Sequence, residues 1–386
     1  MHHPVRSRSA LLGAAFLMAT SAIGPGFLTQ TTVFTVQLGA SVGFVILLSV
    51  LLDLGAQINI WRVVVASGQR GPVLASRVIP GLGTVLTVLI ALGGLAFNIG
   101  NIAGTGMGME AAFGVPAKWG AAASALVAIG LFLNKEAGRA VDLFSRVLGL
   151  GMILLTAWVA VSAHPPLVEV AYRTFWPEKI DTSAILTLVG GTVGGYISFA
   201  GAHRLLDAGY SGPGQVHVVT RSALQGIGVA TFMRILLFLA AWGVVASGAS
   251  VDPANPPASV FQLAAGPWGY RFFGLVIWAA AITSVVGATF TTLSFLNSSF
   301  PNTARHYQPM VIGFILFSLL VFVVVGKPVA LLVWAGKVNG YILPLALSAI
   351  LLAARRPELT QGYRLPLLWQ SIGWVVVVVM GGMAVG

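Results

Sequence analysis

Apolar residues follow one another along the chain in long stretches, for example over residues 42–52, 141–163 and 374–386. Short segments rich in Arg, Pro or Asn separate these stretches. A helix needs about 20 mostly apolar residues to cross a bilayer, so the pattern predicts about eleven spanning helices. The expected spans are 11–39, 43–66, 82–113, 117–133, 142–163, 184–208, 220–248, 270–297, 309–326, 328–353 and 365–385.

The first expected span is interrupted. The stretch SAIGPGFLTQTTVFT (residues 21–35) places Gly24-Pro25-Gly26 ahead of a run of Thr and Gln. Proline removes a backbone donor, and glycine offers little resistance to leaving the helix. Unsatisfied polar groups are costly in lipid, so we expect a helix break here and a polar half that lines a cavity. A simple kink, with threonines bonding back to their own helix, is the alternative.

The sixth expected span carries a second interruption. The stretch LVGGTVGGYISFAGAHRLLDAG (residues 188–209) has paired glycines at 190–191 and 194–195. Such pairs can be packing faces. Interruptions five spans apart are also what two inverted repeats produce around a midplane site in secondary transporters. We therefore expect one transmembrane domain, 1–386, with repeats over about 11–163 and 184–353 and an extra helix at about 365–385.

Composition supports a membrane protein. Of the residues, 57% are hydrophobic and 8% charged, and none is cysteine, which excludes disulfides and thiolate metal sites. The net charge of +11 comes from basic residues scattered between the expected spans, which fits membrane topology better than nucleic-acid binding. With the N-terminus in the cytoplasm, most Lys and Arg residues fall on that side, as in a bacterial inner-membrane protein. A cleavable signal is the alternative reading of the first segment, but this charge balance needs the segment to be retained.

Several stretches occur in an order typical of one transporter family. They are LLGAAFLMATSAIGPGF (11–27), QLGASVGF (37–44), IAGTGMGMEAAFGVPAKWG (102–120), GGTVGGY (190–196) and the pair Leu343-Pro344. The chain thereby resembles the NRAMP family of divalent-metal transporters. The resemblance implies an all-α polytopic membrane protein with the LeuT-type fold, an inverted repeat of 5+5 helices in which helices 1 and 6 are broken.

The positions that bind metal or carry protons in the family hold different residues here. In the resemblance, the metal-binding Asp and Asn of span one fall on Gly24 and Phe27, and the Met and His of span six fall on Gly194 and Tyr196. Acidic residues of the proton route fall on Asn98 and Asn101, and a span-ten Gln falls near Gly336, beside Lys337. A divalent cation needs several oxygen, nitrogen or sulfur ligands, usually with a carboxylate. We therefore expect no metal site at the breaks.

Without a carboxylate, the positive ends of half-helices favour an anion or a neutral polar solute. Backbone N–H groups over 24–27 and 194–196 are the expected donors, and Lys337 is the expected cation. Arg234 is expected to be buried with a carbonyl or carboxylate partner. The candidate substrate-binding residues are Gly24, Pro25, Gly26, Phe27, Thr29, Gln30, Thr192, Gly194, Gly195, Tyr196, Ser198 and Lys337.

These residues predict a secondary transporter, not an enzyme, that moves a small anion by alternating access. Phe27 and Tyr196 narrow the site, which favours bicarbonate. A small carboxylate or an amino acid derivative such as 5-oxoproline, a divalent cation (Mg²⁺ or Mn²⁺), and a transport-dead membrane sensor are the alternatives. The expected partners are the small-molecule or ion substrate and the lipid bilayer, with no nucleic acid; the oligomeric state is left open.

No cofactor is expected beyond Na⁺ or H⁺ as a coupling ion. The candidate residues for coupling are Asp53, Asn98, Asn101 and His203. Asp53 is also expected to pair with a nearby base such as Arg62, or with backbone, and His203 is expected near the cytoplasmic end of span six.

Overall fold

The computed structural model describes residues 24–300 and 305–385, except for the side chains of 135–146, and all regular structure in these ranges is helical. The α-helices are α2 (Pro25–Leu38), α3 (Val42–Ser67), α4 (Gly71–Val78), α5 (Leu82–Phe113), α6 (Ala117–Leu133), α7 (Lys135–Ser162), α8 (Leu167–Phe175), α9 (Thr182–Val193), α10 (Gly195–Asp207), α11 (Val216–Ala246), α12 (Pro256–Ser299), α13 (Tyr307–Val325), α14 (Pro328–Ala354) and α15 (Leu367–Val385). Two short 3₁₀ turns, η1 (Gly39–Ser41) and η2 (Pro213–Gln215), join their neighbours.

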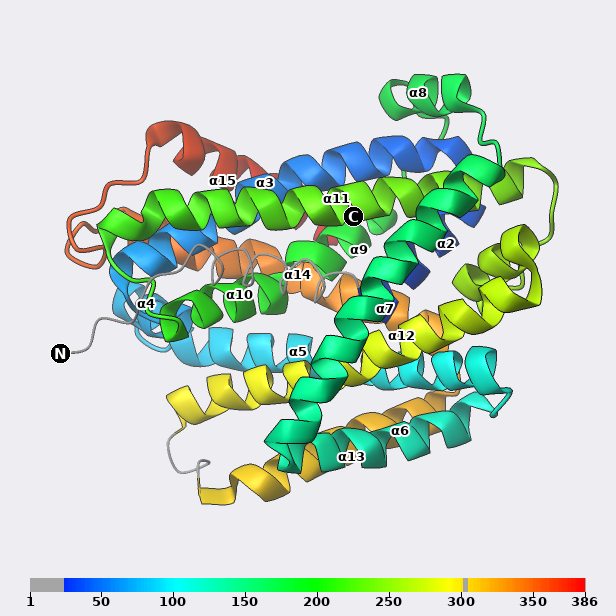
Figure 1. Ribbon diagram of the computed structural model, residues 1–386. Coiled ribbons are helices and arrows are strands. Elements are labelled where there is room, and N and C mark those ends of the chain that lie inside the picture. The colour runs from blue at the N-terminus through cyan, green and yellow to red at the C-terminus, as the bar shows by residue number, and fades with distance from the viewer. Residues whose placement is uncertain (1–23, 301–304, 386) are drawn as a thin grey trace.

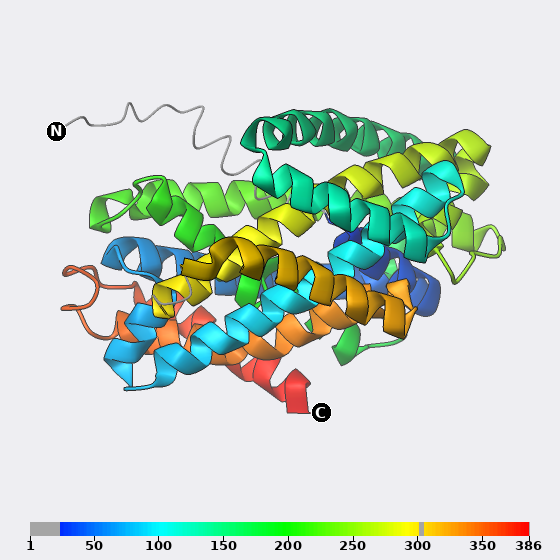
Figure 2. The same ribbon diagram turned by 90° about the horizontal axis from the view of Figure 1, so that it is seen from below.

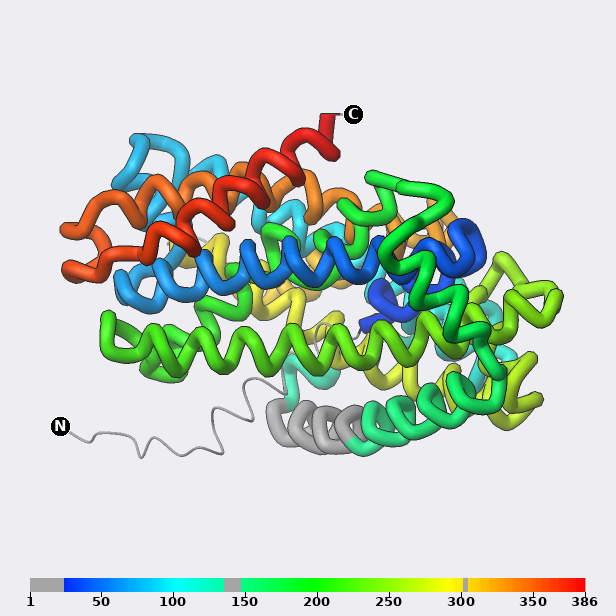
Figure 3. Tube along the Cα trace, turned by 90° about the horizontal axis from the view of Figure 1, so that it is seen from above, coloured from blue at the N-terminus to red at the C-terminus, as the bar shows by residue number. Residues whose placement is uncertain are grey.

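The long helices form a bundle in which most elements run side by side and α7 crosses obliquely (Figure 1). Helices α3 and α11 lie next to each other along their length (Figures 1 and 3). The broken span formed by α9 and α10 is central. In an apolar 18-residue stretch of this span 89% of the residues are buried, against 22% in α13 and 17% in α15. Helices α6 and α13 form one edge and α15 lies at the opposite edge (Figures 1 and 2). The span formed by α9 and α10 is therefore surrounded mostly by protein, whereas α13 and α15 are mostly exposed at the surface of the bundle.

The bounds of several observed helices agree closely with the expected spans, but the number of spanning helices differs from the expected number. The bounds expected at 82–113 and 117–133 are those of α5 and α6. In the described part, eight helices are long and apolar enough to cross a membrane, or nine if the pair Val147–Ser162 and Leu167–Phe175, bent by 104°, is one span. The count of about eleven is therefore not confirmed. The apolar run Pro25–Ser67 is continuous across α2, η1 and α3, and α6 has only 17 residues.

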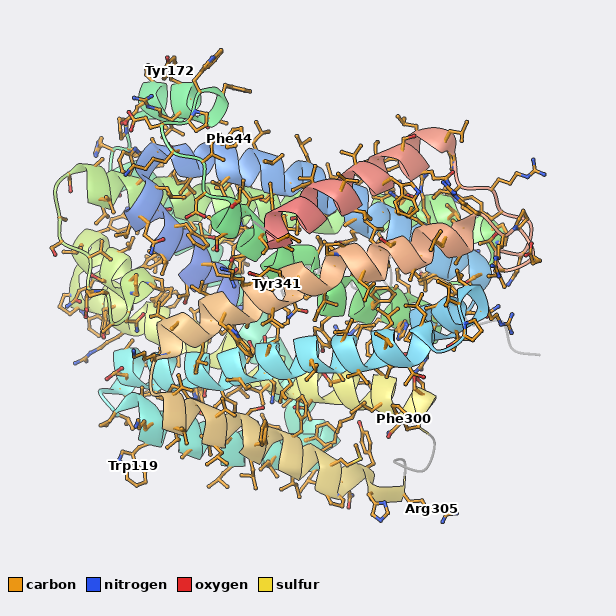
Figure 4. All side chains as sticks on the ribbon, turned by 180° about the vertical axis from the view of Figure 1, so that it is seen from behind. Phe44, Trp119, Tyr172, Phe300, Arg305 and Tyr341 are labelled. Carbon is orange, nitrogen blue, oxygen red and sulfur yellow. The ribbon has the colours of Figure 1, made fainter. Side chains whose placement is uncertain are left out.

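The sequence patterns did not indicate three structural features: the helices α4 and α8, and the bend in α12. The short helices α4 and α8 connect longer ones, and α8, which carries Tyr172, stands at the margin of the bundle (Figure 4). Helix α12 begins at Pro256, ahead of the expected span, and bends at Gly266, whose φ is 67°. Glycine tolerates this left-handed φ, and the following Pro267 removes a donor, so the helix can bend without ending.

Small residues let helices cross closely around the breaks. A Cβ atom on Gly190 of α9 would collide with backbone atoms of Gly336 and Gly340 on α14. A Cβ on Gly104 of α5 would lie 2.5 Å from Cβ of Pro25. Helices that approach this closely need glycine at the contact, as in other tightly packed membrane helices. The glycine pairs of span six are therefore a packing face as well as a helix break.

Candidate functional site

The first described helix begins where the sequence predicts a break. Helix α2 begins at Pro25, and Gly24 before it is extended, with φ −93° and ψ −178°. Proline suits the first helical position because its missing N–H would have no partner there. The backbone N–H of Leu28 donates to the Gly24 carbonyl at 3.2 Å and closes the first turn. The part of this span that precedes residue 24 lies outside the described residues.

The polar run after this break divides into two groups. The hydroxyls of Thr31, Thr32 and Thr35 donate to carbonyls of their own helix at 2.9, 3.0 and 2.8 Å. For these three threonines the alternative of back-bonding to the helix is therefore correct. By contrast, the Thr29 hydroxyl and Gln30 Oε1 are buried without a hydrogen-bond partner among the described residues.

Gln30 connects the first break to two other helices. Its Nε2 donates to the Leu332 carbonyl of α14 at 2.8 Å. The amide also fills the space that a Cβ on Gly191 or on Gly336 would occupy. Gln30 therefore fixes the start of α2 between α9 and α14.

The second break also lies where it is predicted, but its N-terminal donors are not all free. Gly194 separates α9 from α10 with φ −51° and ψ 168°. The backbone N–H of Tyr196, which we expected to face the substrate, donates to Asn339 Oδ1 at 3.1 Å. Asn339 Nδ2 in turn donates to the Gly93 and Ala335 carbonyls, at 3.0 Å each. The expectation of an open α10 N-terminus is therefore wrong at Tyr196, because a side chain of α14 caps it.

Two other predicted residues of span six fasten α10 to its neighbours. The Tyr196 hydroxyl donates to the Ala288 carbonyl of α12 at 3.3 Å. The Ser198 hydroxyl donates to the Val193 carbonyl at 2.6 Å, and the Ser198 carbonyl accepts from Trp61 Nε1 at 3.0 Å. These contacts hold the second half-helix against α3 and α12.

A buried arginine connects the two broken spans. Arg234 of α11 is 1% exposed, and its Nη2 donates to Thr192 Oγ1 at 2.9 Å. Its Cζ lies 4.4 Å from the centroid of the Phe27 ring, in cation–π contact. Phe27 follows the first break and Thr192 precedes the second. The positive charge is therefore held both at the start of α2 and at the break between α9 and α10.

Asp53 of α3 completes this cluster. It is 1% exposed, interacts electrostatically with Arg234 and lies beside Thr192. The two charges do not close into an ion pair: in the described part such pairs join Arg70 to Asp207 and Arg173 to Glu178. We refer to Phe27, Asp53, Thr192 and Arg234 as the central cluster.

The expected pairing of Asp53 with Arg62 is wrong. Arg62 Nε donates to Thr220 Oγ1 at 2.8 Å, and its guanidinium lies 4.9 Å from the Trp369 ring. These contacts direct Arg62 towards α11 and α15, away from the aspartate. The basic group that interacts with Asp53 comes from another helix, α11, which spacing along α3 could not indicate.

Lys337 is not brought into the central cluster. It is half-buried on α14, on the helix face that carries Trp334 and Tyr341, which are 47% and 44% exposed. Figure 4 shows Tyr341 midway along the outer face of α14. The cation that the structure does place between the breaks is Arg234. Its signal in the sequence is its position inside a span, where an ionisable residue is a functional candidate.

Of the four coupling candidates, Asp53 joins the central cluster and the other three do not. Asn98 Nδ2 donates to Ser318 Oγ of α13 at 2.9 Å. Asn101 is buried on α5, one helical turn before Gly104, which faces Pro25. His203 Nε2 accepts from the Gly71 backbone N–H at 3.2 Å, at the junction of α10 with α4.

Relatives of this chain are bacterial membrane proteins. It is 52% identical over 379 residues to the uncharacterized membrane protein YcsG of Bacillus subtilis, covering 98% of this chain and 94% of the relative. It is 53% identical over 373 residues to an uncharacterized membrane protein of Haemophilus influenzae, covering 97% and 94%. The sequence pattern of the Nramp family, described as natural resistance-associated macrophage protein-like, matches residues 15–386. The chain belongs to the Nramp family.

Solved structures similar to this Nramp protein share its fold. A mutant of the Eremococcus coleocola manganese transporter superposes with a TM-score of 0.73 at 14% identity, covering 100% of this chain and 87% of that one. MhsT in complex with L-phenylalanine gives 0.68 at 14% identity, covering 100% of both chains. The nucleobase-cation symporter MHP1 gives 0.61 at 16% identity, covering 96% and 92%. The expected LeuT-type fold is confirmed, and the protein is an integral membrane transporter of the Nramp type.

Proposed function

We propose that this Nramp protein is a secondary transporter of the bacterial inner membrane, with its N-terminus in the cytoplasm, that moves a small anion by alternating access. Bicarbonate is the substrate we favour, and transition metals are not carried. The observation behind this proposal is the buried guanidinium of Arg234, which contacts Phe27 beside one helix break and Thr192 beside the other.

An arginine in this position favours oxyanions. Guanidinium groups remain charged in proteins and form short, charge-assisted hydrogen bonds with carboxylate-like oxygens. The N–H groups of Gly26 and Phe27 lie in the first turn of α2, before the intrahelical ladder begins, and add partial positive charge at the same end. Phe27 and Tyr196 are large and buried, which favours a substrate of few atoms.

Two other substrate classes are compatible with part of this chemistry. A small carboxylate or an amino acid derivative presents the same oxygens to Arg234. A divalent cation is the second candidate, because the structural relative from Eremococcus coleocola is a manganese transporter. In the central cluster the acidic ligand would be Asp53 alone, and the positive charge of Arg234 beside it would repel Mn²⁺ or Mg²⁺.

Uptake into proteoliposomes tests the proposal. Purified protein is reconstituted, and uptake of labelled bicarbonate, Mn²⁺ and Mg²⁺ is measured under imposed Na⁺ or pH gradients, at mildly alkaline pH where little CO₂ is present. Empty liposomes are the control for leakage. Bicarbonate uptake that depends on the protein, without metal uptake, supports the proposal, and the gradient that accelerates it identifies Na⁺ or H⁺ as the coupling ion. Metal uptake without any response to anions would refute it.

A further inference from the structure

The two charged members of the central cluster each keep an unused hydrogen-bonding atom. Asp53 Oδ1 and Arg234 Nε are buried and have no hydrogen-bond partner among the described residues. One is an acceptor and the other a donor. Buried ions in proteins normally pair directly, because an unpaired charge is costly in a medium of low dielectric. Here the pair stays open, although the two groups interact electrostatically.

Neighbouring contacts keep the guanidinium in this position. Its Nη2 is held by the hydroxyl of Thr192, and the Phe27 ring covers its face. The Thr192 hydroxyl is itself committed, because it donates to the Leu188 carbonyl at 2.6 Å. The unused donor on Arg234 and the unused acceptor on Asp53 therefore lie within one cluster, between groups that already have partners.

We propose that the substrate is an oxyanion that carries its own hydrogen-bond donor. Its charged oxygen accepts from Arg234 Nε, and its O–H or N–H donates to Asp53 Oδ1. This inference rests on the proposed function and narrows the class of anion. Bicarbonate, hydroxy acids and amino acid derivatives with an N–H satisfy both atoms. Nitrate and acetate satisfy the arginine and leave the aspartate without a donor.

The preference for anions with a hydrogen-bond donor follows from the free-energy cost of leaving a buried polar atom without a hydrogen bond. A ligand without the donor leaves Asp53 Oδ1 without a hydrogen bond and brings a negative charge towards it that no shared hydrogen bond offsets. A site built to hydrogen-bond a substrate O–H or N–H rejects analogues that lack it far more strongly than a site that senses size alone. We expect matched anions without a donor to bind about 10- to 100-fold more weakly.

Two matched pairs of anions test this. Nitrate is planar, singly charged and similar in size to bicarbonate but has no proton to donate. Acetate carries the same carboxylate as glycolate but lacks its hydroxyl donor. Each competes with labelled bicarbonate for uptake into proteoliposomes at constant pH. For the wild-type protein, nitrate and acetate should require about 10- to 100-fold higher concentrations than their donor-bearing counterparts.

A variant of Asp53 tests which residue makes the distinction. Asp53→Asn keeps the shape but supplies an amide that can donate, so nitrate should compete nearly as well as bicarbonate. Glu110→Gln, which removes an exposed carboxylate at the end of α5, is the control and should leave the preference unchanged. The wild-type comparison stands by itself if Asp53→Asn does not fold.

The outcomes separate this inference from the function on which it rests. Absence of any anion uptake refutes the proposed function. Anion uptake with equal competition by nitrate and bicarbonate refutes only the donor requirement. Asp53→Asn could keep the preference for bicarbonate while its uptake is no longer accelerated by a pH gradient. Asp53 would then carry a proton and would not distinguish between anions, and the inference is overturned.

Discussion

The guanidinium of Arg234 lies 4.4 Å from the centroid of the Phe27 ring, so a residue of α11 covers the first turn after the helix break of α2. Because the same guanidinium holds Thr192, Arg234→Met should remove a charge from both breaks together. We expect the apparent affinity for bicarbonate to fall about 10- to 100-fold, as for the loss of a hydrogen bond to a charged group. Concentration-dependent uptake into proteoliposomes measures this change.

Two other basic residues of the spans provide controls for this variant. Lys337→Met removes the cation first expected to bind the substrate, and Arg62→Met removes an arginine that contacts Thr220 and Trp369. Both should leave the apparent affinity within about twofold, since surface-directed or remote charges contribute little. A large loss of apparent affinity in Lys337→Met, with none in Arg234→Met, would show that Lys337 and not Arg234 binds the substrate.

A carboxylate introduced at position 24 should repel an anionic substrate. Gly24 has an extended backbone that an L-residue can adopt, and aspartate is a favourable residue ahead of a helix N-terminus. Gly24→Asp should therefore fold normally but reduce bicarbonate uptake, because its charge occupies the positive end of α2. Thermal unfolding in detergent checks the fold and uptake checks the site. Unchanged uptake would remove Gly24 from the substrate site.

Asn339 should be essential to the second break. Its side chain accepts from the Tyr196 N–H and donates to the Gly93 and Ala335 carbonyls. Asn339→Leu loses all three hydrogen bonds and leaves the buried Tyr196 N–H in the first turn of α10 without a partner, which we expect to destabilise the protein by about 2–4 kcal/mol. Thermal unfolding in detergent measures it. Asn98→Leu, which loses a single bond to Ser318, should have a smaller effect.

Substitution of Gly190 should disrupt packing between α9 and α14. A Cβ there collides with backbone atoms of Gly336 and Gly340, which cannot move aside as a flexible side chain would. Gly190→Ala is therefore expected to lower the yield of folded protein and its thermal stability. The matched variant Gly130→Ala on α6 meets nothing within 4 Å and should be neutral or slightly stabilising. Equal stability of the two variants would contradict the observed crossing.

Sequence patterns located the start of α2 and the break between α9 and α10, because both signals are local. Gly24-Pro25 and Gly194-Gly195 disfavour a continuous helix through backbone geometry, whatever lies around them. The same holds for the bounds of α5 and α6, which apolar runs and turn residues define. The number of spans does not follow from such signals, because length and hydropathy do not show whether α2 and α3 cross the membrane separately.

The chain's own sequence thus determined a LeuT-type membrane protein with interruptions predicted at Gly24-Pro25 and at Gly194-Gly195, and with no acidic side chain at either place. Only the tertiary structure decided which charges meet there. Arg234 and Asp53 lie on different helices, 181 positions apart (234 minus 53), and no spacing rule links them. Asn339 likewise caps α10 from α14. Local signals fix where a helix breaks, whereas the partners of a buried polar group depend on how distant helices pack.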